Sequence, residues 1–573
     1  MSRRPVVLRS GAALSCALFL SSLSSSRAAH AQDRPSEADL FGGAATPPAA
    51  APSAPPNAAS SGSAPPAAAA GAANGASEPP SAAPVPPAAG AVGEPAAPNP
   101  SPGESRDARD SQVLGASTSA MFNEEAAPDD PLKLGGQLYL RAQTTGSRGQ
   151  QLGNWAFSAP SLLDVYLDAR PNDRVRGFVL GRMTYDPTLP TSASDSESIR
   201  AVSATGSTSG SQSLSSLFQQ PTRGPTVSLD QMWLRFDVAH TVFVTAGKQH
   251  VRWGTGHFWT PSDFLHLRPR NPLDVFDART GTTMLKLHLP IESQAWNFYG
   301  YLLTEGTGAT SSLGSVAAAT RAELVLGPAE LGLGVLAKRD QKPKFAGDLS
   351  FGIGDFDVYG ELALRSGNEI DRVRYDASAM PAAPDTPPSW QTPDQAAQAA
   401  LAQVVDAYYP VYRSRGYKPQ LVAGTSYAQK YNDNDTFTVG AEYFYNALGY
   451  DSPVAYPGLV LPHSVSLNDS ANFFYLGRHY AALYVSFPAP FSLDTHTFTL
   501  STLGNLSDQS YITRFDYSLV VLTHIRFEAF VSARYGNENG EFRFGVSHLN
   551  LGGIDFTRAP ALMDLGIALR IAI

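Results

Sequence analysis

After residue 130, apolar residues recur at every second position in segments of about ten residues. Segments 163–170, 355–364, 525–535 and 565–573 place Leu, Ile, Val, Phe or Ala at most second positions, with polar, charged or small residues between them. Successive side chains of a β-strand point to opposite faces. These segments therefore predict strands whose two faces meet different surroundings.

The connections between the segments distinguish a membrane barrel from a soluble sandwich, which also alternates. Short and long connections follow each other along the chain, as in outer-membrane barrels with short periplasmic turns and long outer loops. Four polar loops of this length would be unusual in a soluble domain. The short connections are 171–173, 239–240, 327–328 and 432–434, and the long ones include 186–225, 253–279, 367–416 and 448–476.

The pattern predicts an all-β fold: a transmembrane, antiparallel, up-and-down β-barrel over residues 132–573, with about 18 strands and a range of 16–20. After residue 130 the chain holds no run of 18 apolar residues that would form a membrane helix. An even number of strands leaves both ends of the barrel in the periplasm. The expected strands are 134–143, 161–170, 174–185, 226–238, 241–252, 281–289, 294–303, 318–327, 329–339, 346–354, 355–366, 418–431, 434–446, 478–487, 495–504, 511–522, 523–536 and 560–573.

The first 31 residues have the layout of a secretory signal peptide. Basic residues precede an apolar stretch, 11–23, and Ala29-His30-Ala31 forms a cleavage site of the A-x-A type. Cys16 lies within this segment and is the only cysteine, so the mature chain has no cysteine. Disulfides and cysteine metal sites are therefore excluded from the mature protein.

Residues 32–131 are dominated by Ala, Pro, Ser and Gly. Such a segment buries too little apolar surface to offset its ordering entropy, so we expect a disordered arm. As a flexible coil it would span on the order of 50–60 Å. We interpret it as a periplasmic tether, and the alternative is an arm that contacts peptidoglycan or another partner.

Basic residues gather around segment 247–281, which we identify as the candidate pore region. We assign strand residues to the lumen or the lipid face by parity, that is, by whether their position in the alternation is odd or even. This assignment puts Lys248, His250 and Arg252 together at the end of one strand. It also puts more basic than acidic side chains in the lumen, although the net charge of the whole chain is −9. Charge that lines a pore biases which ions enter it. We expect 253–279 to fold inward as the constriction. The candidate selectivity residues are Lys248, His250, Arg252, His257, Arg268, Arg270, Arg279, Arg235 and Lys286.

The segment also resembles a broad set of outer-membrane transport barrels, in which a strand ending G-[RK]-Q-x-x-x-W-G leads into a P-x-D loop. Here the matching residues are Gly247, Lys248, Gln249, Trp253, Gly254, Pro261 and Asp263. That set includes porin-like channels and substrate-export barrels. The resemblance covers some 35 residues and implies a barrel more than any particular substrate.

Enzymatic, metal and cofactor chemistry are not expected. His250, His257 and His266 do not have the spacing of a familiar metal site. A Ser–His pair on adjacent strands with an orienting acid was also not found, and His463-Ser464 falls in an expected outer loop. Nucleic acid is not expected as a partner.

Two functions remain open for an outer-membrane barrel of this kind. The first is a porin-like channel for passive passage of small polar, in particular anionic, solutes. The second is a barrel that exports or anchors an acidic polysaccharide, which would also need a basic lumen. The expected partners are outer-membrane lipid, lipopolysaccharide and the barrel-assembly machinery.

The loop 367–416 carries one helical signal. Ala397, Ala400, Leu401, Val404 and Val405 recur at helical spacing after Pro393. We expect a short helix over 394–408, outside the membrane or leaning over the mouth of the pore.

The first prediction concerns the arm. Because residues 33–130 lack core-forming side chains, deleting them should leave barrel assembly and resistance to heat unchanged. Heat-modifiable mobility in gel electrophoresis measures both properties. Loss of the folded, fast-migrating species in the deletion variant would show that the arm is part of the fold.

Overall fold

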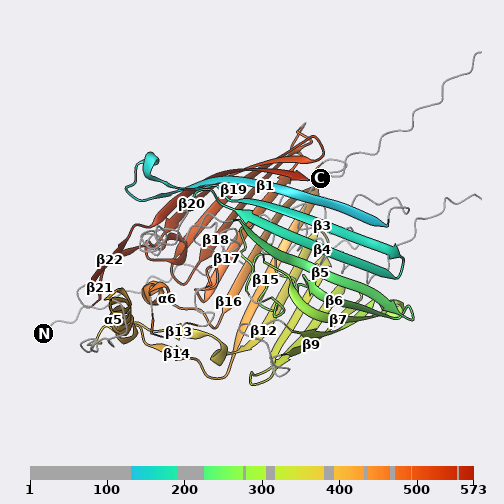
Figure 1. The fold of residues 1–573 in the computed structure, drawn as a ribbon, viewed down its shortest axis with the longest axis horizontal. Coiled ribbons are helices and arrows are strands. Elements are labelled where there is room, and N and C mark those ends of the chain that lie inside the picture. Colours follow the sequence, from blue (N-terminus) through green and yellow to red (C-terminus); the bar gives the residue numbers. More distant parts are fainter. Residues whose placement is uncertain are drawn as a thin grey trace, which may run out of the picture.

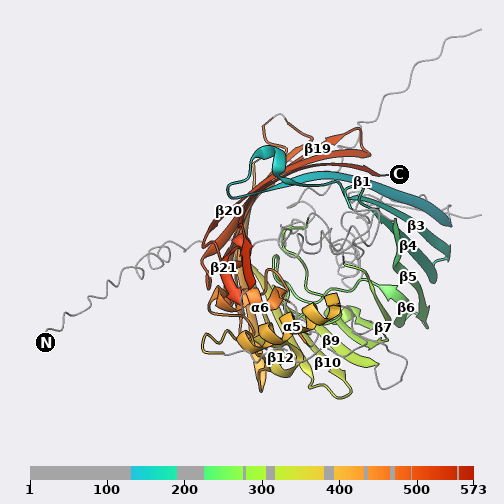
Figure 2. The same ribbon diagram turned by 60° about the vertical axis from the view of Figure 1, so that its left-hand side comes forward.

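The computed structural model describes residues 131–572 except 190–224, 267, 275–278, 305–315, 380–392, 432–435, 462, 465–466, 468–471, 492 and 552–553. The expected signal peptide and nearly all of the arm lie outside the described residues. The described chain forms an antiparallel sheet of 19 strands that closes on itself (Figures 1 and 2). Closure is made by β1, which pairs with β3 on one side and with the last strand, β23, on the other.

Eighteen of these strands build the barrel wall, and the remaining one, the three-residue β2 (Ala156–Ser158), pairs only with the end of β1. The wall strands are β1 (Leu132–Ser147), β3 (Ser161–Asn172), β4 (Val175–Tyr185), β5 (Thr226–Val238), β6 (Val242–Gln249), β7 (Thr282–Ile291), β8 (Trp296–Leu303), β9 (Ala317–Leu326), β10 (Ala329–Lys338), β11 (Lys344–Ile353), β12 (Phe356–Ser366), β15 (Tyr417–Lys430), β16 (Thr436–Asn446), β17 (His479–Pro488), β18 (His496–Asn505), β19 (Ser510–Val521), β20 (Ile525–Gly536) and β23 (Ala561–Ala572). Each overlaps one segment expected from the alternation, so the predicted fold and strand number are confirmed.

The barrel wall is apolar outside and polar inside, the reverse of a soluble protein. Buried positions on the inner face include Asp164, Arg182 and Arg321, which are at most 4% exposed. Large apolar side chains on the outer face are exposed instead, which is stable only against lipid. The barrel is therefore an outer-membrane protein. Its outward-facing apolar residues include Leu140, Val165, Val179, Leu234, Leu287, Leu302, Leu333, Leu349, Leu362, Leu421, Leu483, Leu500, Phe515 and Ile567.

The two ends of the barrel differ as expected from the loop lengths. At the end that holds both termini of the barrel, β5 and β6 are joined by residues 239–241, and β9 and β10 by 327–328. The long connections lie at the other end, which is the extracellular side in barrels of this type.

At the extracellular end, the described parts of three long loops pack together into what we call the outer cap: residues 367–416, 447–478 and 537–560. It contains α5 (Pro393–Tyr408), α6 (Tyr456–Val460) and the small hairpins β13–β14 (Asp371–Val373, Val411–Arg413) and β21–β22 (Val546–Leu551, Ile554–Arg558), shown at one end of the barrel in Figure 1. Helix α5 confirms the helix expected in 367–416. A separate apolar core joins the three loops: Val373, Val405, Tyr409, Tyr450, Ala455, Tyr456, Leu459, Leu476 and Phe544.

Among the described residues, no helix combines the length and the apolar character that crossing a bilayer requires.

The opposite polarity of the two faces predicts how the wall responds to a charge. Leu362 lies near the middle of β12 on the outer face and is 41% exposed. Leu362→Arg should lower the free energy of unfolding in lipid by about 2–4 kcal/mol, and Leu132→Arg at the periplasmic rim by about 0–1 kcal/mol. Denaturant titration in liposomes measures both, and equal losses would contradict the assigned membrane position.

Candidate pore constriction

Residues 250–281, which we call the inner loop, leave the end of β6 and return to the start of β7. Figure 2 shows this segment inside the barrel. Its described part contacts the lumen faces of β12, β16 and β19, far from the strands that carry it. The expectation that 253–279 folds inward is confirmed for these residues.

Glu442, on the lumen face of β16, binds the backbone of the inner loop. Its carboxylate accepts the backbone N–H groups of His257, Phe258 and Trp259 at 2.6–3.2 Å. The hydroxyl of Tyr359 on β12 donates to the same carboxylate at 2.8 Å. Successive backbone N–H groups form a concave site for an anion, and here the anion is a side chain of the barrel wall.

Glu361, on the lumen face of β12, holds the same loop at neighbouring positions. It accepts the backbone N–H groups of Thr255 and Gly256 at 3.1 and 3.2 Å and that of Ser262 at 2.6 Å. Glu361 and Glu442 are 3% exposed, so water does not compete for these bonds. We call the pair the glutamate staples.

Two glycines of the inner loop allow this close approach. A Cβ atom on Gly254, which has a φ of +98°, would collide with the Glu361 carboxylate. A Cβ atom on Gly256 would collide with the carbonyl of Trp259. Gly254 is therefore required by the contact with Glu361, and Gly256 by the turn that follows it.

Aromatic packing fills the space around the staples. Trp259 is fully buried, its ring stacks on Phe444 at 5.6 Å between centroids, and its Nε1–H donates to the carbonyl of Phe474 at 3.0 Å. His257 stacks on Tyr484 at 4.5 Å. These contacts join the loop to β16, β17 and the outer cap.

Asp230 secures the start of the inner loop. The register between β4 and β5 shifts at Leu180, so Asp230 lies in a bulge and is 2% exposed. Its carboxylate lies 3.2 Å from His250 Nε2 and 3.5 Å from Arg182. Bulges often re-aim one side chain of a strand, and this one provides a partner for His250 that parity did not reveal.

Asp263 secures the middle of the loop. It lies 2.9 Å from His266 Nδ1 and 3.0 Å from Arg279. Burial acts to raise the pKa of Asp263, but the neighbouring His266 and Arg279 outweigh it and hold that pKa below its usual value. Asp263 is therefore ionised at neutral pH, and Arg279 stabilises the loop through it.

The structure corrects the expected position of Lys248. It pairs with Met232 on β5 and Thr283 on β7, and this face carries the exposed Leu287, so Lys248 lies on the outer face of the wall. The lumen face of β6 consists of the odd positions, including the buried Thr245 and Gln249. Lys248 therefore does not share a lumen face with His250 and Arg252, which follow the end of β6.

The other candidate residues of the loop occupy different positions. Arg252 donates to the carbonyl of Gly256 within the loop. Arg268 is exposed, and its carbonyl accepts a bond from Arg279 at 3.1 Å. Arg270 is 7% exposed, and its carbonyl accepts the hydroxyl of Tyr475 at 3.3 Å.

Arg235 and Lys286 lie on the lumen face, as parity predicted. Arg235 lies opposite Thr245, and its guanidinium is 5.8 Å from the centre of the Trp233 ring. Lys286 is 5% exposed, with its ammonium 5.1 Å from the centre of the Tyr299 ring.

The lumen is more evenly charged than parity predicted. Asp348 and Asp564 are also buried in the lumen, where they pair with Arg321 and Arg534, each at 2.8 Å. Arg141 is buried as well, and it lies 4.6 Å from the centre of the Phe530 ring. With Lys248 outside and these acids inside, the basic excess of the strand-borne lumen side chains shrinks.

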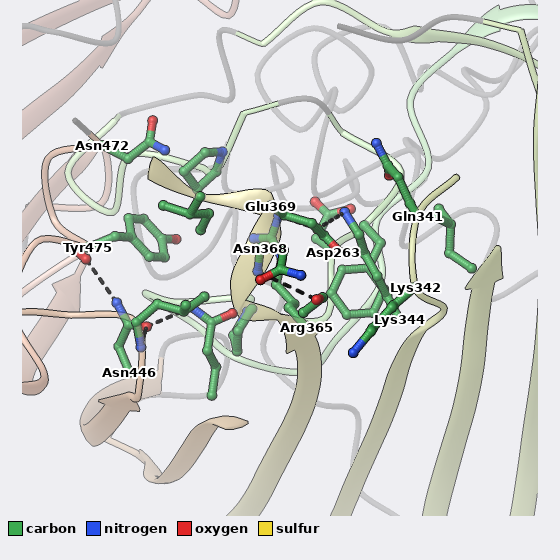
Figure 3. Close-up of a pocket in the computed structure, with 18 of the residues that line it drawn as sticks. Asp263, Gln341, Lys342, Lys344, Arg365, Asn368, Glu369, Asn446, Asn472 and Tyr475 are labelled. Carbon is green, nitrogen blue, oxygen red and sulfur yellow. Dashed lines mark hydrogen bonds and ion pairs between the residues drawn. The ribbon is translucent and has the colours of Figure 1, made fainter. Parts of the chain in front are cut away.

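A cavity of about 690 Å³ lies between the inner loop and the extracellular ends of β10, β11, β12, β15 and β16; we call it the outer cavity. Figure 3 shows Lys342 and Lys344 at one side, and Asn446 and Tyr475 at the other. Basic side chains outnumber acidic ones in its lining. The basic residues are Lys338, Lys342, Lys344, Arg365, Arg372 and Arg413, and the acidic ones are Asp263, Asp340, Glu369 and Asp371.

His463 and Ser464 pack against a carboxylate in the outer cap. Asp406 on α5 lies 2.6 Å from His463 Nδ1 and accepts the backbone N–H of Ser464 at 3.1 Å. The Ser464 hydroxyl donates to Asp406 and not to His463. This arrangement ties the 447–478 loop to α5. Within the described residues, groups of three or more potential metal ligands were not found.

The staples predict a local response to substitution. Glu442→Gln removes the charge and places an amide NH₂ against backbone N–H groups, costing on the order of 2 kcal/mol of local stability. Hydrogen exchange at residues 257–259 should therefore accelerate roughly 10- to 30-fold. Glu292→Gln, at an exposed periplasmic carboxylate, is the control. Unchanged protection at 257–259 in Glu442→Gln would contradict the staple.

Neither a protein-family model nor a curated protein matches this chain. The solved structures that match this chain include OccAB1 of Acinetobacter baumannii, with 11% identity, a TM-score of 0.42 and coverage of 77% of this chain and 96% of that protein. OccK11 (OpdR) of Pseudomonas aeruginosa has 7% identity, a TM-score of 0.40 and the same coverage. A mutant of the Rh. blastica porin has 10% identity, a TM-score of 0.34 and coverages of 77% and 100%. The closed strand pairing and the apolar outer face make this chain an 18-stranded outer-membrane β-barrel with a loop folded into its lumen.

Proposed function

We propose that this protein is an outer-membrane channel for the passive passage of small polar solutes, with a preference for anions. The observation that supports it is the outer cavity, a basic vestibule of about 690 Å³ between the inner loop and the wall. Pockets of this size match small molecules. Solutes entering from outside would meet this vestibule before the inner loop.

The charges of the outer cavity favour anions even after its ion pairs are considered. Glu369 pairs with Lys344 at 2.7 Å and approaches Arg365 at 3.8 Å. Asp371 pairs with Arg413 at 2.5 Å. Lys338 and Lys342 add further positive charge at the rim. Charge in a confined space acts more strongly than on an open surface, where salt screens it within about 8–10 Å.

The stapled inner loop favours a small solute over the alternative, an acidic polysaccharide. A polymer needs a continuous wide passage, whereas residues 255–262 cross the lumen and bond to β12 and β16. Export would require these buried bonds to Glu361 and Glu442 to break. Passive diffusion of small solutes past a fixed loop requires no such step.

Arg252, Arg268 and Arg270 remain the proposed selectivity residues of the inner loop. Arg268→Glu combined with Arg252→Glu and Arg270→Glu should shift the reversal potential in a salt gradient toward cations. Lys248→Glu is the matched control, because Lys248 lies on the outer face and should leave the potential unchanged. Planar-bilayer recordings measure both, with heat-modifiable mobility as the test of folding.

Two results would contradict this assignment. If the reversal potential of the folded triple variant is unchanged, these arginines do not set the ion selectivity. Lys338→Glu combined with Lys342→Glu would then test whether the outer cavity sets it. A folded wild-type barrel that conducts no ions would contradict the channel itself. The contacts of the arm with peptidoglycan and of the barrel with the assembly machinery stay predictions.

A further inference from the structure

Two buried carboxyl groups share one amide at the extracellular end of the barrel, where the turn between β18 and β19 meets the outer cap. Asn505 Nδ2 donates to Asp508 Oδ2 at 2.8 Å and to Glu541 Oε2 at 2.9 Å. The backbone N–H of Glu541 also donates to Asp508 Oδ2, at 2.8 Å. Asp508 and Glu541 are each 2% exposed. We call Asn505, Asp508 and Glu541 the carboxyl latch.

The latch connects separate extracellular segments. Glu541, in the loop after β20, accepts the hydroxyl of Tyr480 at 2.6 Å and the backbone N–H of Leu476 at 3.4 Å. Asp508, in the turn between β18 and β19, accepts the hydroxyl of Tyr456 on α6 at 3.1 Å. Opening the latch would therefore release the 447–478 loop at two places.

The segment next to the latch also holds the inner loop. The carbonyl of Phe474 accepts Trp259 Nε1–H at 3.0 Å, and Tyr475 donates to the carbonyl of Arg270 at 3.3 Å. The Phe474 ring packs on Phe542, the residue after Glu541, at 5.4 Å between centroids. A path of direct contacts therefore runs from Glu541 to the constriction.

The surroundings of Glu541 favour its neutral form. Burial, followed by the charge of Asp508, raises the pKa of Glu541 to about 8, and burial also raises the pKa of Asp508. Tyr480 and Tyr456 face the pair from β17 and α6. Arg534, on β20, donates to the carbonyl of Phe542 at 3.3 Å but is paired with Asp564.

These pKa directions fix the sign of the pH response. A closed latch keeps a proton on Glu541 up to about pH 8, whereas an opened, hydrated Glu541 would lose it near its ordinary pKa of 4.5. Opening releases a proton between these values, so it becomes easier as pH rises from about 4.5 to 8. Above that range the effect levels off, because both forms are ionised.

We propose that the protonated carboxyl latch stabilises the outer cap in acid. As extracellular pH rises, loss of this proton increases the mobility of residues 472–476 and of the inner loop that they hold. Its effect on current rests on the proposed channel function. The opening of the latch itself does not.

Hydrogen exchange tests the latch without any transport assay. Across pH 5–8, after correction for intrinsic rates, protection of the amides of Leu476 and Glu541 should fall by up to about tenfold per pH unit in the folded protein. Glu541→Gln should remove most of this slope. Glu538→Gln, an acid of the same loop that pairs with Arg148 and Arg543 and whose side chain is 44% exposed, should retain it. The proposed latch would be contradicted if protection in the wild type did not depend on pH, or if a folded Glu541→Gln variant kept the full pH dependence.

Single-channel recording tests the link to the constriction. Raising pH on the extracellular side alone should increase current fluctuations, and the same change on the periplasmic side should not. If hydrogen exchange depends on pH but the current fluctuations do not change with extracellular pH, the coupling between the latch and the inner loop is contradicted. A barrel that carries no current at any pH would contradict the channel, while hydrogen exchange would still decide the latch.

Discussion

Two carboxylates that accept backbone N–H groups organise the interior of this barrel. The inner loop has little secondary structure of its own, so its amide groups need partners elsewhere. Glu361 and Glu442 provide them from the opposite wall, at buried positions where such bonds are strong. The aromatic packing of Trp259, the path of the arginine-bearing segment and the floor of the outer cavity all depend on this attachment.

The barrel itself could be predicted because lipid and the polar lumen sort side chains at every second position. Leu362 faces lipid and Glu361 the lumen, and no tertiary information is needed to see the difference. For Lys248, the assignment of strand faces by parity gave the wrong side of the wall. The expected strand ran to residue 252, whereas β6 ends at Gln249, so the alternation that grouped Lys248 with His250 and Arg252 does not extend to the last two. Val242, Val244 and Ala246 share the parity of Lys248 and carried the correct signal.

The staples and the outer cap could not be predicted, because their partners lie far apart in the sequence. The alternation of their strands places Glu361 and Glu442 in the lumen, but no local pattern connects them to residues 255–262. One clue exists in the strand register: Glu361 lies opposite Asp348 and Val422, and Glu442 opposite Gly424 and Ala482, so neither faces a basic residue across the sheet. A buried acid without a basic cross-strand neighbour points to donors from elsewhere, but the register was needed to see it.

The position of the staples along the chain sets an order for biogenesis. Gly256 precedes Glu361 by 105 residues, and His257 precedes Glu442 by 185. The inner loop cannot reach its final place until β12 and β16 have joined the growing wall. Before that, water is the partner of the Glu361 and Glu442 carboxylates and of the backbone N–H groups of the loop. Narrowing of the pore is therefore a late event, separate in time from the pairing of the first strands.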